Sequence, residues 1–140
     1  MRLSLALIMP ESTEAQDWMA HKGKAAKLGE KLRQTILTIL PDINEIPNLK
    51  GAFITYAIGD DYEDTVIVIR SDGPLWSIGF YRGRELPDPE GLLKGNGRLH
   101  AAAIIAGRAD VESGALRALI ESAYDAALKR KEERERTGGA

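Results

Sequence analysis

A run of acidic side chains has the chemistry to bind a metal ion: Asp60, Asp61, Glu63 and Asp64. Carboxylate oxygens are the hard ligands that calcium, magnesium and iron accept. The run lacks the ligand spacing and the central glycine of a calcium-binding loop. Charged residues at the tip of a hairpin also form ordinary solvated turns. Two interpretations of this turn therefore remain open, a metal site and a charged loop.

A second group of residues combines glycines with arginines: Arg82, Arg84, Gly95, Gly97 and Arg98. Backbone N–H groups that glycine leaves accessible bind anions, and nearby cationic side chains add to the attraction. Glycine also allows the positive φ that a tight connection requires. This group is either a binding site for a small anionic ligand or a purely structural connection.

No residue pattern indicates an enzyme. Cysteine is absent, and the two histidines, His21 and His100, lie far apart in the sequence. Neither a nucleophile elbow nor a phosphate-binding loop is present. The formal charge of -2 provides no positive field for nucleic acid. We expect a non-enzymatic binding or interaction domain whose partner is a small anionic ligand or a protein, with cofactor and oligomeric state unknown and an enzyme of unrecognised class as an alternative.

Length and composition predict one domain. With 140 residues and 44% hydrophobic content, the chain is long enough for one core. We assign residues 1–128 to this domain, and residues 129–140 to a charged helix extension with a flexible tail. The apolar run in residues 1–10 is shorter than the ~20 residues of a membrane helix, and we expect a strand or a packed arm there. The absence of cysteine agrees with a cytoplasmic location and no membrane partner.

Helical periodicity marks both ends of the chain. Residues 12–40 carry apolar side chains at steps of three and four, which predicts helix. Gly23 and Gly29 interrupt this pattern, so one long helix or two helices meeting near residues 21–24 are both possible. A closing helix begins near residues 110–113 and presents an apolar stripe: Leu116, Leu119, Ile120, Ala123 and Ala127. A short helix is predicted at residues 88–93, because Asp88 can cap it.

The middle of the chain predicts an antiparallel sheet. Turn-forming residues separate three β-like runs: 52–58, 65–70 and 75–81. Residues 101–106 predict a further strand, and residues 42–51 predict a connection. Alternation places Trp76, Ile78 and Phe80 on the side that faces the core. The expected fold class is therefore α+β, an antiparallel sheet of about four to five strands packed by N-terminal and C-terminal helices.

One stretch resembles a known family. Residues Ile78 to Gly97 contain an aromatic strand followed by the loop pattern Leu-x-Asp-Pro-x-Gly-Leu-Leu-x-Gly-x-Gly. This is similar to the signature of the bacterial YdhG-like family, the domain of unknown function numbered eighteen-zero-one, and the resemblance extends over about residues 12 to 128. Some members of that family are called frataxin-like iron chaperones. The resemblance thus implies a metal (iron) chaperone as the alternative function, and the acidic run described above is the candidate metal site that its own residue chemistry indicates.

Overall fold

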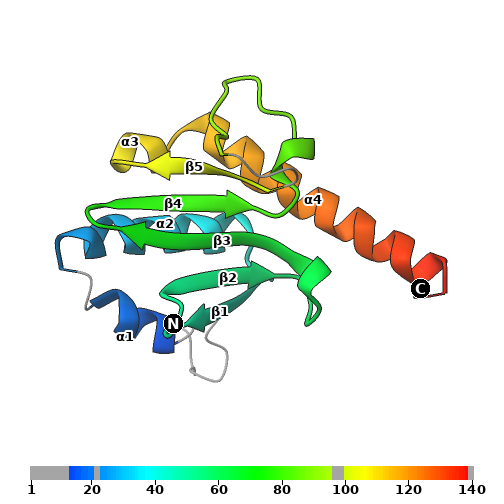
Figure 1. The fold of residues 1–140 in the computed structure, drawn as a ribbon, viewed down its shortest axis with the longest axis horizontal. Coiled ribbons are helices and arrows are strands. Elements are labelled where there is room, and N and C mark those ends of the chain that lie inside the picture. The colour runs from blue at the N-terminus through cyan, green and yellow to red at the C-terminus, as the bar shows by residue number, and fades with distance from the viewer. Residues whose placement is uncertain (1–12, 21–22, 96–99, 139–140) are drawn as a thin grey trace.

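An antiparallel sheet forms the centre of the molecule (Figure 1). The computed structural model describes residues 13–20, 23–95 and 100–138. Its sheet has five strands in the order of the sequence: β1 Asn44–Asn48, β2 Phe53–Ala57, β3 Thr65–Asp72, β4 Leu75–Phe80 and β5 Ala101–Ile105. Each neighbouring pair is antiparallel. The predicted meander and the α+β class are confirmed.

The helices come from the two ends of the chain. They are α1 Thr13–Ala20, α2 Ala26–Ile39, α3 Arg108–Val111 and α4 Gly114–Arg136, with single 3₁₀ turns η2 Gly23–Ala25, η3 Tyr62–Asp64 and η4 Gly83–Glu85. In Figure 1, α2 passes behind the sheet and α4 continues past it toward the C-terminus. Within the described ranges, no helix has the length and apolar character needed to cross a membrane.

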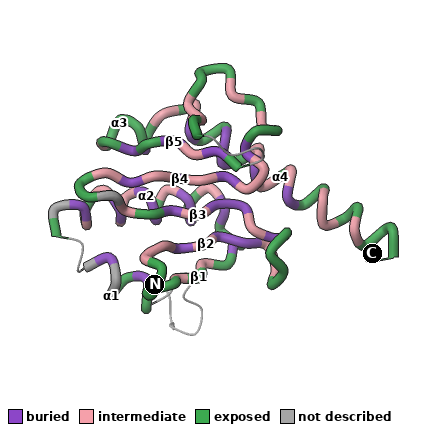
Figure 2. The backbone as a smooth tube through the Cα atoms, viewed as in Figure 1, coloured by how far each residue is buried: buried purple, intermediate pink, exposed green. Residues whose placement is uncertain are grey.

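The two faces of the sheet differ in burial. Trp76, Ile78 and Phe80 in β4 are fully buried, as predicted, and pack in one core with helix residues such as Leu32 and Leu119. Buried and half-buried residues alternate along β4, which Figure 2 shows as alternating purple and pink, and along β2 up to its last residue. Successive side chains of a strand point to opposite faces. The face away from α2 and α4 therefore carries the half-buried set and is open.

Residues 42–51 were predicted as a connection, and this is wrong because they contain β1. The strand pairs with β2 through the register Pro47↔Ile54. Proline has no N–H to donate, so it is confined to edge strands, and β1 is the first strand of the sheet. Its polar sequence has no apolar alternation, and only the pairing with β2 defines it as a strand.

Residues 88–93 were predicted as a short helix, and this is also wrong. The Asp88 carboxylate accepts hydrogen bonds from the N–H groups of Leu92 and Leu93, both at 2.9 Å. Gly91 has φ +68°, which a right-handed helix does not allow. The capping interaction of Asp88 therefore exists, but it closes a turn.

The helix boundaries agree with the two-helix alternative. α1 ends at Ala20, and α2 begins at Ala26 after Gly23 at φ +61°. α2 ends at Ile39, before Pro41. Ser113 caps α4 by accepting a hydrogen bond from the Leu116 N–H at 3.1 Å. The arm predicted at residues 1–10 lies outside the described residues.

Candidate functional site

A row of residues with small side chains crosses the middle of the open face of the sheet. The register aligns Thr55 with Val68, Val68 with Gly79, and Gly79 with Ala102. Gly79 adds no side chain and Ala102 adds only a methyl group. The middle of this face is therefore recessed relative to the larger side chains around it. The resulting cavity, called the hollow below, has a volume of about 470 Å³. Small-molecule sites commonly measure roughly 300–1,000 Å³.

Larger side chains bound the hollow at both ends. Phe53 and Arg70 are register partners at one end, where the guanidinium carbon of Arg70 lies 4.6 Å from the centre of the Phe53 ring. Tyr81 and His100 lie at the other end, each two positions beyond the central row, together with Tyr62 from η3. The hollow is thus lined by small side chains at its base and by aromatic rings at its ends.

The aromatic wall is held by hydrogen bonds. Tyr81 packs against both of its neighbours, with ring centroids 5.2 Å from Tyr62 and 4.8 Å from His100. The backbone N–H of Arg82 donates to His100 Nδ1 at 2.9 Å. The imidazole proton therefore lies on Nε2, which donates to the Tyr62 hydroxyl at 3.2 Å. Both ring nitrogens of His100 are engaged in these contacts, so the imidazole is held in place as part of the aromatic wall.

Arg70 brings a positive charge to the hollow. Of the described residues that line it, Arg70 is the only one with a formal charge, and none is a carboxylate. In the part of the chain that the structure describes, no carboxylate lies within ion-pair distance of Arg70. Hydroxyl groups of Thr55, Thr65 and Ser77 add hydrogen-bonding capacity to otherwise apolar walls. This combination suits a molecule with a planar apolar body and one negative group.

Two members of the predicted anion-binding group lie in η4 or beside it. Arg82 pairs with Glu85 through two contacts of 2.8 and 2.5 Å. The Arg84 guanidinium donates to the Gly95 carbonyl. Gly95 has φ +126°, so the predicted structural role of positive φ is confirmed there. Gly97 and Arg98 lie outside the described residues.

The acidic run is divided between the surface and the interior. Asp60, Asp61 and Glu63 are exposed, whereas Asp64 is buried. The Asp64 carboxylate contacts Arg134 at 2.5 Å and Lys131 at 3.5 Å. Among the described residues, no group of three or more possible ligands is placed to hold a metal ion. The metal interpretation stays a prediction, and its one buried carboxylate is already paired with cations.

Several interactions set the protonation of Asp64. Burial alone would raise the pKa of its carboxyl group, because a charge is poorly solvated in the interior. The hydrogen bond from the Asp61 N–H and the charges of Lys131 and Arg134 act in the opposite direction and outweigh burial. The pKa of Asp64 therefore lies below its ordinary value, and this carboxylate is charged at neutral pH.

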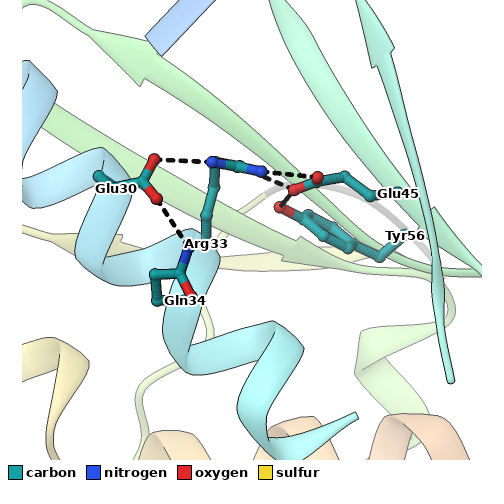
Figure 3. Close-up of polar contacts among 5 residues, drawn as sticks. All are labelled: Glu30, Arg33, Gln34, Glu45 and Tyr56. Atoms are coloured by element: carbon teal, nitrogen blue, oxygen red, sulfur yellow. Dashed lines mark hydrogen bonds and ion pairs between the residues drawn. The ribbon is translucent and has the colours of Figure 1, made fainter. Parts of the chain in front are cut away.

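A buried charged cluster joins α2 to β1, and sequence reasoning missed it (Figure 3). Arg33 donates to both oxygens of Glu45, at 2.8 and 2.7 Å, and also to Glu30. The Tyr56 hydroxyl donates to Glu45 at 2.7 Å. The signal in the sequence is an arginine next to Leu32 on the apolar stripe of α2.

The protonation of this cluster follows from its burial. Burial, followed by the charge of Glu45, raises the pKa of Tyr56 far above its ordinary value, so the phenol stays protonated. Burial alone would lower the pKa of Arg33, but its bonds to Glu45 and Glu30 outweigh that effect and raise it. Perturbed groups of this kind also occur at active sites. Here the charges satisfy one another inside the core, so we assign the cluster a structural role.

Comparison of the chain with protein-family models, with curated proteins and with solved structures found no match. The resemblance to the YdhG-like family therefore stays a prediction. The candidate site is defined by the geometry of the open sheet face alone.

Proposed function

We propose that this domain binds a small organic anion in the hollow on the open face of its sheet. The observation that carries the proposal is a cavity of about 470 Å³ with aromatic walls, in which Arg70 is the one formally charged side chain among the described lining residues. Aromatic rings offer flat apolar area to a ligand. A guanidinium group pairs with carboxylate or phosphate through parallel hydrogen bonds.

The side chains at the two ends of the hollow favour a small-molecule ligand over a long, extended one. Phe53 and Arg70 stand at one end of the small-residue row, and Tyr81 and His100 stand at the other. A ligand that fills the row is therefore limited in length to the space between them. The proposal retains the non-enzymatic binding role expected from the sequence, and Arg70 supplies the cation. As the compartment we propose the cytoplasm, since a chain without cysteine suits reducing conditions.

A substitution at Gly79 tests the proposal directly. A Cβ atom at this position would lie 3.5 Å from the Val68 carbonyl oxygen and 4.0 Å from the Ala102 Cβ, which are ordinary contacts. Gly79→Leu should therefore fold and fill the hollow. We expect aromatic carboxylates such as benzoate or indole acetate to bind the wild-type protein in calorimetric titrations. We expect no binding to Gly79→Leu.

A second variant tests the role of charge. Arg70 is exposed, so Arg70→Gln should leave the fold intact. Loss of one charged hydrogen bond should weaken carboxylate binding by at least about tenfold. Binding of the matching uncharged amides should change little. Arg117→Gln, an exposed arginine on α4, is the matched control. Equal affinity in wild type and Gly79→Leu, or no binding of any aromatic anion, would refute the proposed function.

A further inference from the structure

Within the described residues, Arg130 of α4 forms no ion pair with a carboxylate. Its guanidinium carbon lies 5.0 Å from the centre of the Tyr81 ring. Its Nε atom is buried and has no hydrogen-bond partner among the described residues. The side chain as a whole is half-buried, so an ion can still reach the guanidinium group. Burial, and after it the like charge of Arg82, lowers the pKa of Arg130.

Two carboxylates in this part of the molecule are paired with other cations. Glu85 contacts Arg82 at 2.5 Å. Asp64 contacts both Lys131 and Arg134. Arg82, Lys131 and Arg134 therefore each have a carboxylate partner, whereas no ion pair of Arg130 is found within the described residues.

An unpaired, partly desolvated charge is unfavourable in a folded protein. The planar donor group of arginine matches the oxygens of phosphate and carboxylate. We propose that Arg130, together with Arg82, binds an oxyanion of the phosphate type beside Tyr81. Neither arginine lines the hollow described above. This second site therefore does not depend on the proposed function, although Tyr81 lies between the two.

Inorganic phosphate is the probe for this site. Thermal unfolding and calorimetric titration are performed with phosphate replacing chloride at constant ionic strength. We expect saturable binding and a rise in the melting temperature of the wild-type protein, because a ligand that binds only the native state stabilises it. Arg130→Gln should lower phosphate affinity at least about tenfold. Arg117→Gln, with its arginine paired to Glu121 on the same helix, should bind phosphate like the wild type.

A folding defect in Arg130→Gln would also lower phosphate affinity. We therefore choose a second variant that is expected to bind phosphate more tightly than the wild type. Glu85 is exposed and neutralises Arg82, so Glu85→Gln should release Arg82 and tighten phosphate binding. Gly79→Leu should leave phosphate binding unchanged, which separates this site from the hollow. An equal phosphate response in wild type and Arg130→Gln would overturn the inference. Unchanged or weaker binding by Glu85→Gln would overturn it as well.

Discussion

The effect of Gly29 on stability depends on the side chains that other elements place against it. In an isolated helix, glycine is less favourable than alanine by about 1 kcal/mol. In the structure Gly29 faces the Trp76 ring, and a Cβ atom there would lie 2.2 Å from Trp76 Cζ2. The same Cβ would lie 2.5 Å from the Met19 sulfur. The glycine therefore permits close packing of α1 and α2 against the sheet.

Gly29→Ala should destabilise the protein despite the better helix propensity of alanine. Overpacking a core costs about 1–3 kcal/mol, and the better helix propensity of alanine offsets about 1 kcal/mol of this, so we expect a net loss of up to about 2 kcal/mol in urea denaturation. Gly114→Ala is the control, because nothing lies within 4 Å of a Cβ atom at that position. It should stay within about 1 kcal/mol of the wild type. A more stable Gly29→Ala protein would contradict the close packing.

Among the elements, β1 is joined to α2 by the buried side chain of Glu45. Glu45 is the β1 residue whose carboxylate accepts from both Arg33 and Tyr56 in the interior. Its side chain is 1% exposed. The loss of this carboxylate removes both Glu45 contacts from the buried Arg33 charge, while the contact with the half-exposed Glu30 is retained. The edge strand is thus anchored by charge in place of an apolar face.

Glu45→Gln should destabilise the protein by about 3–5 kcal/mol, the usual effect of breaking a buried ion pair. Hydrogen exchange should become faster in β1 and in its partner β2. Tyr56→Phe is the milder comparison, because it removes one hydrogen bond and should cost about 1 kcal/mol. If the two variants lose the same stability, the ion pair is not the main attachment of β1.

At the scale of the whole molecule, Asp64 connects the β2–β3 turn to the last turns of α4. Asp64 and Arg134 are separated by 70 residues in the sequence. Residues 129–136, which we assigned to a charged extension, continue α4 and contribute Lys131 and Arg134 to this contact. The charged end of the helix therefore takes part in tertiary structure.

The stability of the fold should fall in acid partly because of Asp64. Its folded-state pKa is lowered, so its contribution is present above the unfolded pKa and is lost as pH falls through the folded value. Asp64→Asn should cost about 1–3 kcal/mol at pH 7. The difference from wild type should shrink below about pH 4, where the unfolded carboxyl group is protonated. Urea denaturation measured from pH 7 to pH 2.5 tests this, and a constant difference would contradict it.

The sequence by itself determined the features that depend on local pattern. Alternation in residues 75–81 identified the buried face of β4, and the apolar stripe of residues 116–127 identified the packing side of α4. The start of the closing helix was predicted near residues 110–113, and the structure places its cap at Ser113, because a serine caps the residues that directly follow it. These signals are contained within a few residues, so no distant partner is needed to interpret them.

Only the tertiary structure decided which residues meet. The hollow arises because Val68, Gly79 and Ala102 share one row, and that row is set by strand register. The pairing of Arg33 with Glu45 and the contact of Arg130 with the Tyr81 ring depend on how α2 and α4 lie against the sheet. Side-chain type alone does not reveal such contacts, because the same arginine is solvated, paired or unpaired according to the elements packed around it.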